Sequence, residues 1–129
     1  MSTTELTYNQ LQYDLQQYYS TEHYYKIIPF INAVITDGVK AFADKTNSYW
    51  LFTDLIFLDG YRIARTHDDK FTLIKVTVND KHQVNVVFMH DIGEKPYWEA
   101  TQKDLLEYIP IGEYKFHLVD TVLSLPTEY

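Results

Sequence analysis

The spacing of apolar residues changes near residue 70 of the chain. Up to that point, apolar residues recur at steps of three and four, as they do on one face of a helix. Beyond it, they alternate with polar residues, as in strands that bury one face. This order predicts an α+β fold, in which N-terminal helices at about 4–58 pack on a C-terminal antiparallel meander sheet of four to five strands at about 71–125.

Two amphipathic helices are predicted first. One spans about residues 4–18, and Ser2 with Glu5 has the spacing of a capping box at its start. The other spans about residues 37–45, and Thr36 is the residue expected to cap its N-terminus.

A third helix is predicted at about residues 48–58, where apolar residues run nearly all round the helical wheel. A helix of this kind is usually buried. We expect it to end at the Asp-Gly pair that follows. We also expect Trp50 to be buried on it, and Leu51, Leu55 and Leu58 to face the sheet.

Residues 71–90 predict a β-hairpin, because two alternating runs flank a segment of turn-forming residues, Asn79-Asp80-Lys81-His82. The side chains expected to be buried are Ile74, Val76, Val84, Val86 and Phe88. Further strands are predicted at 97–102, 113–119 and 121–125, with a turn near Asp120, whereas 102–108 fits either a strand or a short helix.

Length and composition describe one domain, residues 1–129, with 46% hydrophobic and 22% charged residues. The chain has no cysteine, which removes disulfides, cysteine-ligated zinc and thiol catalysis. No apolar stretch approaches the roughly 20 residues that span a bilayer, and the N-terminus does not resemble a signal peptide. We therefore expect a cytoplasmic protein that does not contact a membrane.

Charge is the next guide to function. The net charge is −7, and residues 66–129 carry most of it, with 11 acidic and 6 basic residues. An acidic surface disfavours direct contact with phosphates and favours a basic partner, such as a protein whose own groove holds nucleic acid. Plain solubility explains the same charge. The acidic residues proposed for binding are Glu94, Glu99, Asp104 and Glu107.

The chain is also rich in tyrosine, with twelve in all. Two adjacent pairs, Tyr18-Tyr19 and Tyr24-Tyr25, are candidates for stacking on bases or filling a groove of a partner. The alternative is that one tyrosine of each pair faces the core and the other is half-exposed. Arg62 and Arg65, the only arginines, form with Lys26 a basic spot too small for strong duplex binding.

Catalytic and metal-binding patterns are scarce. His67-Asp68-Asp69, His90-Asp91 and His117 are scattered and lack a His-x-x-x-His spacing, so we expect no metal and no cofactor. There is no Gly-x-Ser-x-Gly elbow and no glycine-rich phosphate loop. We expect a protein that is not an enzyme. The alternative is a cryptic enzyme that uses His90 with Asp91, or His67 with Asp68.

Four segments, taken in order, carry a family resemblance: residues 21–25 (Thr-Glu-His-Tyr-Tyr), 36–40 (Thr-Asp-Gly-Val-Lys), 49–51 (Tyr-Trp-Leu) and 125–129 (Leu-Pro-Thr-Glu-Tyr). The chain resembles an uncharacterised family of small single-domain proteins, a domain of unknown function in bacteria, phages and other mobile elements. The family more often has Ser at the position of Thr127, and its acidic residue follows Tyr-Trp-Leu more closely than Asp54 does here.

The resemblance carries no activity, but its setting implies a role. Compact acidic proteins of mobile elements are often inhibitors of host defence, which include anti-CRISPR proteins. The leading hypothesis is therefore a non-enzymatic anti-CRISPR protein that binds a CRISPR effector, whether RNA- or DNA-targeting, or contacts its guide RNA. The alternative is a housekeeping protein–protein interaction domain. Either a monomer or a homodimer is compatible with the sequence.

Overall fold

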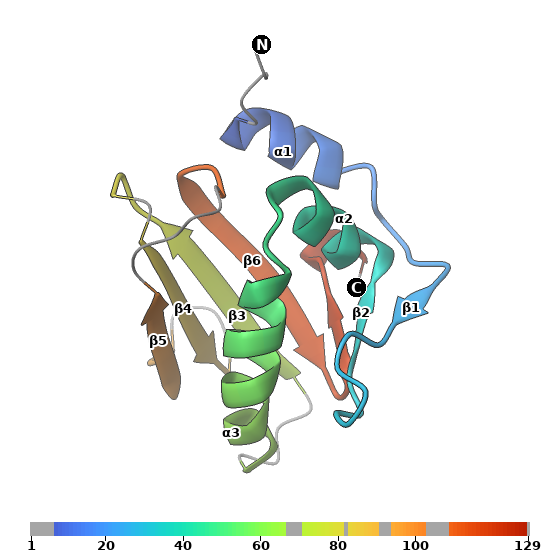
Figure 1. The fold of residues 1–129 in the computed structure, drawn as a ribbon, viewed down its shortest axis with the longest axis vertical. Coiled ribbons are helices and arrows are strands. Elements are labelled where there is room, and N and C mark those ends of the chain that lie inside the picture. The colour runs from blue at the N-terminus through green and yellow to red at the C-terminus, as the bar shows by residue number, and fades with distance from the viewer. Residues whose placement is uncertain (1–6, 67–70, 82, 91–93, 103–108, 129) are drawn as a thin grey trace.

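A computed structural model describes residues 7–66, 71–81, 83–90, 94–102 and 109–128. The described residues form a seven-stranded mixed sheet with the helices against one of its faces (Figure 1). The strands are β1 (Tyr24–Tyr25), β2 (Val34–Thr36), β3 (Phe71–Val78), β4 (Val84–Met89), β5 (Trp98–Gln102), β6 (Gly112–Val119) and β7 (Val122–Ser124). The helices are α1 (Tyr8–Leu15), α2 (Asp37–Thr46), η1 (Leu51–Gly60), α3 (Tyr61–Thr66) and the short turn η2 (Pro126–Glu128).

The predicted α+β class is confirmed, but the predicted sheet of four to five antiparallel strands is too small. The observed sheet has the spatial order β1-β2-β7-β6-β3-β4-β5, and β2 pairs with β7 in parallel. The two extra strands come from the N-terminal half and contain only two and three residues. Strands this short show no alternating pattern, so periodicity could not reveal them.

The hairpin of β3 and β4 is confirmed. Val76 pairs with Val86, and the antiparallel register runs from Leu73↔Met89 to Val78↔Val84. The five side chains expected to be buried are all buried: Ile74, Val76, Val84, Val86 and Phe88.

The later strands lie at their predicted positions along the chain, but the predicted meander is wrong, because β6 pairs with β3 and not with β5, which precedes it in the sequence. β6 pairs with β3 along its whole length, and β7 returns beside β6 through a turn in which Asp120 has a left-handed φ of 56°. The ambiguous segment 102–108 lies outside the described residues after its first position.

The first helix is shorter than the predicted 4–18. α1 begins after Thr7, whose hydroxyl accepts a hydrogen bond from the N–H of Gln10 at 3.1 Å. The predicted capping residues, Ser2 and Glu5, lie outside the described part of the chain. The second helix is confirmed, since Thr36 caps the N-terminus of α2.

The third helix departs from the prediction in winding and in length. η1 is a π-helix, with i→i+5 hydrogen bonds, and it continues into α3. Its buried residues accordingly recur at steps of five: Leu51, Ile56 and Tyr61 in one row, and Phe52 and Phe57 in the next.

This winding changes which side chains face the sheet. Leu51 is buried as predicted, but Leu58 is 41% exposed, and Leu55 and Trp50 are only half-buried. The helical segment does not stop at Gly60, because η1 passes there directly into α3. A side chain at this position would collide with the ring of Phe88, so glycine serves here for close packing against β4.

The main core lies between the helices and the sheet. Phe42 of α2, Phe52 of η1 and Phe116 of β6 meet edge to face, with ring centres 5.2–5.9 Å apart. Such edge-to-face pairs stabilise a core beyond the area that they bury. No helix in the described part of the chain has the length and apolar character required to cross a membrane.

Candidate functional site

Glu128, near the end of the chain, caps the N-terminus of α2. Its Oε2 accepts a hydrogen bond from the N–H of Gly38 at 2.9 Å, and its Oε1 accepts one from the hydroxyl of Thr36 at 2.6 Å. Oε1 also accepts a hydrogen bond from the N–H of Leu125 at 2.9 Å, which closes the η2 turn. A carboxylate at this point satisfies N–H groups that have no partner within the helix, and it opposes the positive end of the helix dipole.

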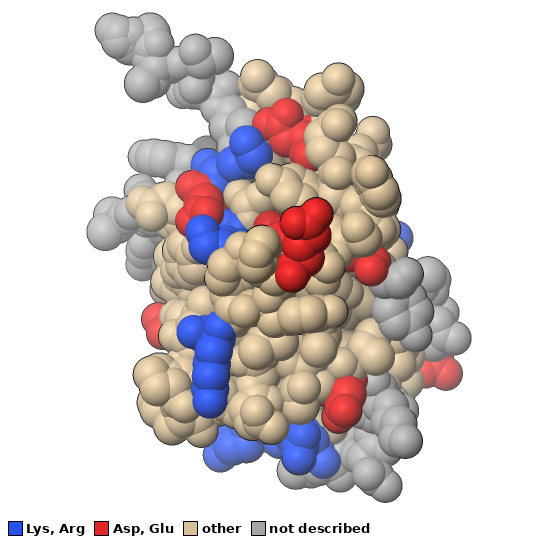
Figure 2. Space-filling model, turned by 90° about the vertical axis from the view of Figure 1, so that its right-hand side faces the viewer, with Lys and Arg blue, Asp and Glu red and all other residues tan. Residues whose placement is uncertain are grey.

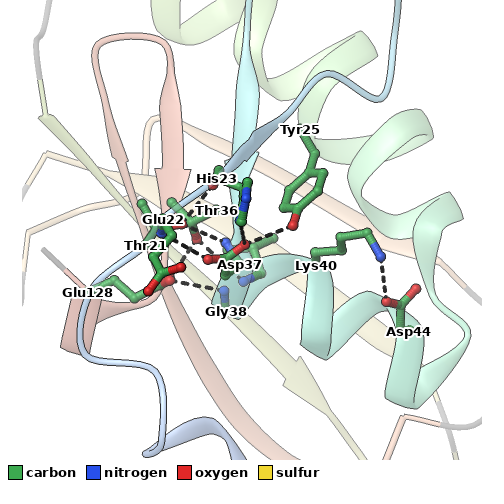
Figure 3. Close-up of polar contacts among 11 residues, drawn as sticks. Thr21, Glu22, His23, Tyr25, Thr36, Asp37, Gly38, Lys40, Asp44 and Glu128 are labelled. Carbon is green, nitrogen blue, oxygen red and sulfur yellow. Dashed lines mark hydrogen bonds and ion pairs between the residues drawn. The ribbon is translucent and has the colours of Figure 1, made fainter.

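Asp37 ties the same end of α2 to residues 21–25 (Figure 3). Its Oδ2 accepts a hydrogen bond from the N–H of Glu22 and its Oδ1 accepts one from the hydroxyl of Tyr25, both at 2.9 Å. In return, the N–H of Asp37 donates to the hydroxyl oxygen of Thr21 at 2.9 Å. Together with the pairing of β1 and β2, these bonds fix residues 21–25 against α2.

The protonation states follow from these contacts. The hydrogen bond from Glu22 holds the pKa of Asp37 below its ordinary value, and the bond from Tyr25 acts in the same direction. The same bond to Asp37 raises the pKa of Tyr25. At neutral pH, Asp37 is therefore ionised and Tyr25 keeps its proton.

A second set of contacts follows the outer side of α2. Nζ of Lys40 lies 2.9 Å from Oδ2 of Asp44 and 5.4 Å from the centre of the Tyr25 ring. The hydroxyl of Tyr49 donates to Oδ1 of Asp44 at 2.7 Å. Residues near the start of η1 are in this way linked through α2 to β1.

The four segments that carry the family resemblance therefore meet around one helix. We call Thr21, Glu22, Tyr25, Thr36, Asp37, Gly38 and Glu128 the Asp37–Glu128 cluster. Local sequence patterns predict the cap at Thr36 and place Asp37 in the first turn of the helix, but they do not predict the contacts with residues 21–25 and with Glu128. The signal for the rest was the joint occurrence of the four segments, because spacing along the chain cannot show that positions about 90 residues apart are in contact.

The chemistry of the Asp37–Glu128 cluster is that of a structural lock. All four carboxylate oxygens of Asp37 and Glu128 accept hydrogen bonds from the chain itself. A carboxylate that acts as a general acid or base must present an oxygen to its substrate. These oxygens instead hold the N-terminal segment, α2 and the C-terminal turn together.

The four tyrosines predicted to bind a partner differ in solvent exposure: two are half-buried and two are exposed. Tyr18 and Tyr25 are half-buried and pack against the core. The side chain of Tyr19 is 78% exposed and that of Tyr24 is 59% exposed. The backbone beside each exposed tyrosine is fixed: the carbonyl of Tyr18 accepts a bond from the hydroxyl of Thr127 at 2.7 Å, and Tyr24 itself lies in β1.

The predicted acidic residues are only partly placed. Glu94 and Glu99 are exposed, and Glu99 lies on β5, where it accepts a hydrogen bond from the side chain of Asn85 at 2.8 Å. Asp104 and Glu107 lie outside the described residues.

His23 lies beside an acid, with its Nδ1 3.7 Å from Oδ1 of Asp37, and two of the histidines considered for catalysis or metal binding contact aromatic rings. The ring of His90 stacks on Tyr97 at 4.7 Å, and His117 meets Phe71 edge to face. Asp91 and residues 67–69 are not among the described positions. Within those positions, no group of three or more His, Asp or Glu residues is arranged to hold a metal ion.

The fold and these contacts define a small α+β domain in which Glu128 caps α2, and Asp37 of the same helix holds the segment that displays Tyr24. The chain belongs to a family of unknown function, DUF6876, whose model matches residues 9–129. Comparisons with curated proteins and with solved structures found no match.

Proposed function

We propose that this domain is a non-catalytic protein-binding module, and that Tyr19 and Tyr24 are the centre of its binding surface. The observation that carries the proposal is that both rings are exposed while the backbone near them is held. Tyr24 lies in β1, and the residue before Tyr19 is hydrogen-bonded to Thr127. An exposed tyrosine supplies a large contact area with few rotatable bonds. A backbone that is already ordered lowers the entropy that a complex must overcome.

The surroundings of these tyrosines suit contact with another protein. Figure 2 looks onto the side that carries β1 and α2, where charged side chains are scattered and most of the area belongs to uncharged residues. Protein interfaces are typically depleted in charge at their centre and enriched in tyrosine.

The specific form of the proposal is an inhibitor of host defence, an anti-CRISPR protein that binds a basic nucleic-acid-handling effector or its guide RNA complex. Two features support it: the net charge of −7 and the exposed carboxylates of Glu94 and Glu99. The resemblance to proteins of mobile elements supplies the setting. In this form, the tyrosines dock the domain and the acidic half occupies a basic channel.

The binding surface is tested with matched baits. A tagged domain and its Tyr19→Ala/Tyr24→Ala double variant are used for affinity purification from the host. We expect a nucleic-acid-handling protein on the wild type and its loss on the variant, with an unchanged melting temperature because both rings are exposed. Tyr13→Ala, at a 66% exposed ring on α1, is the control that should retain the partner. Equal capture by the wild type and the double variant would show that the binding surface does not include Tyr19 and Tyr24.

The charge-based part of the proposal is tested by the kinetics of association. Reversing Glu94 and Glu99 to Lys should slow association with the captured protein more than it speeds release. Raising the salt from about 0.1 M to about 1 M should weaken binding, because the Debye length shrinks from about 10 Å to about 3 Å. Indifference to both changes would contradict occlusion of a basic channel. A partner of metabolic function would favour the housekeeping interaction domain.

A further inference from the structure

A second surface of different character lies beside α3, away from the Asp37–Glu128 cluster. The loop after β1 and the junction of η1 with α3 enclose an open hollow of about 460 Å³. Its lining includes Phe30, Ile31, Phe57, Leu58, Arg62 and Arg65. The wall is therefore apolar, and it contains both arginines of an otherwise acidic chain.

The apolar rim of the hollow is presented by a rigid turn. The N–H of Ile31 donates to the carbonyl of Ile28 at 3.2 Å, and Pro29 occupies the second position of this turn, where its ring favours the geometry. Ile28 is buried and anchors the turn, whereas the ring of Phe30 is 80% exposed. Leu58, which is 41% exposed, lines the same hollow, and exposed apolar side chains that share one surface in this way are typical of an interaction site.

The cationic rim is also positioned. Nη1 of Arg65 donates to the hydroxyl of Tyr61 at 3.3 Å, and its guanidinium lies 5.7 Å from the centre of that ring. Tyr61 in turn donates to the carbonyl of Asn32 at 3.4 Å, which joins α3 to the turn that carries Phe30. Among the described residues, no carboxylate forms an ion pair with Arg65 or with the exposed Arg62. Figure 2 shows basic side chains along the lower edge, at the height at which Figure 1 draws α3.

We propose that this hollow binds an acidic segment of a partner protein, with an apolar side chain of the segment against Phe30 and Leu58. Carboxylates that flank this side chain pair with Arg62 and Arg65. Guanidinium groups bind carboxylates in a two-pronged geometry, and such pairs at the rim of an apolar contact give specificity. The site goes beyond the proposed function, since it uses another surface and a partner segment of opposite charge.

Charge favours an acidic segment over two other occupants of the hollow, a second copy of the chain and a nucleic acid. A two-fold dimer through the same surface would bring the arginines of both copies together, which opposes self-association. A nucleic acid presents a phosphate every few ångströms and would be repelled by a chain of net charge −7, with only two arginines in the hollow to neutralise it. A short acidic segment needs complementarity only within the hollow, because charges farther away are screened over about 8 Å at physiological salt.

The test is a selection of displayed random peptides on the intact domain. We expect enrichment of peptides that place an aromatic or aliphatic residue next to two or more acidic residues. Their affinity should fall about tenfold or more on Arg62→Glu, and likewise on Phe30→Ala. Lys81→Glu, the same charge change at an exposed turn, and Tyr13→Ala should leave it unchanged.

Three results would overturn the proposal. Enriched peptides that lack acidic residues, or that bind Arg62→Glu as tightly as the wild type, would remove the role of the arginines. Displacement of the peptides by single-stranded RNA oligonucleotides would assign the hollow to nucleic acid. A dimer that is lost on Phe30→Ala would assign it to a second copy. Partner capture through Tyr19 and Tyr24 should be unaffected by these variants, so each proposal can fail alone.

Discussion

Gly38 lies where the carboxylate of Glu128 comes closest to α2. A Cβ at position 38 would lie 2.5 Å from Cδ1 of Leu125 and 2.6 Å from Oε1 of Glu128. Glycine in the first turn of a helix ordinarily costs stability relative to alanine, by about 1 kcal/mol in helix interiors. At this position, the missing side chain is what allows the capping carboxylate to enter.

We therefore expect Gly38→Ala to destabilise the domain, against the usual preference of helices for alanine. The clash with Leu125 and Glu128 should cost about 1–3 kcal/mol, in the range of other overpacked sites. Urea unfolding monitored by circular dichroism measures this change. A more stable variant would show that Glu128 is not held at this distance.

Removal of the carboxylate itself is the complementary experiment. Glu128→Ala leaves the N–H of Gly38 and the hydroxyl of Thr36 without their acceptor, so we expect a loss of about 2–4 kcal/mol. Glu94→Ala, at an exposed glutamate, is the matched control and should change stability by no more than about 0.5 kcal/mol. Equal effects of the two variants in urea unfolding would argue against the cap.

At the scale of the element, η1 shows how winding decides burial. A regular α-helix would place Leu51, Leu55 and Leu58 on one face, and this is the face that the sequence pattern predicts to be inward. With i→i+5 hydrogen bonds, the inward row is instead Leu51, Ile56 and Tyr61. The nearly continuous run of apolar residues concealed the difference, because every period fits such a run.

The two windings predict opposite results for one pair of variants. Ile56→Ala should cost about 2–5 kcal/mol, because the side chain is fully buried and its removal leaves a cavity. Leu58→Ala should cost much less, because the side chain is 41% exposed. Thermal and urea unfolding of both variants measures the difference. A larger effect at Leu58 would restore the regular α-helical winding.

The elements that could be predicted are those in which many residues repeat one pattern. β3 and β4 extend over eight and six residues, and their predicted inward row faces the core as expected, although Leu73, Val87 and Met89 on the opposite face are buried as well. β1 and β2 have too few residues to repeat anything, and they exist because β7 and α2 hold them. The same holds for the Asp37–Glu128 cluster: the distances within it depend on tertiary structure, and local patterns show only the cap at Thr36 and the place of Asp37 in the first turn of the helix.

At the scale of the whole molecule, Asp37 makes stability depend on pH. Its pKa in the folded domain lies below the ordinary value of 3.8, chiefly because of the hydrogen bond from Glu22. The unfolded chain therefore takes up this proton at a higher pH than the folded domain does. The stabilisation is present in full above the ordinary value and is lost as the pH falls through the lower, folded value.

We expect the free energy of unfolding to fall as the pH is lowered below 3.8, and to fall less steeply in Asp37→Asn. The variant should be less stable than the wild type at neutral pH, and the two should converge in acid. Urea titrations at a series of pH values measure this. Asn9→Ala, a change at an exposed residue without a titratable group, should run parallel to the wild type. A difference that persists unchanged into acid would contradict the role of the charge.

The parallel pairing of β2 with β7 has a consequence for how the protein is made. β7 lies between β2 and β6, so the first two strands cannot join the rest of the sheet until residues 122–124 exist. Thr36 and Glu128 are separated by 92 positions. At about 5–20 residues per second, a ribosome takes several seconds to cover that distance. For this interval, β1 and β2 have no strand to join them to the rest of the sheet, and we expect the segment that contains them to stay undocked until β7 is made.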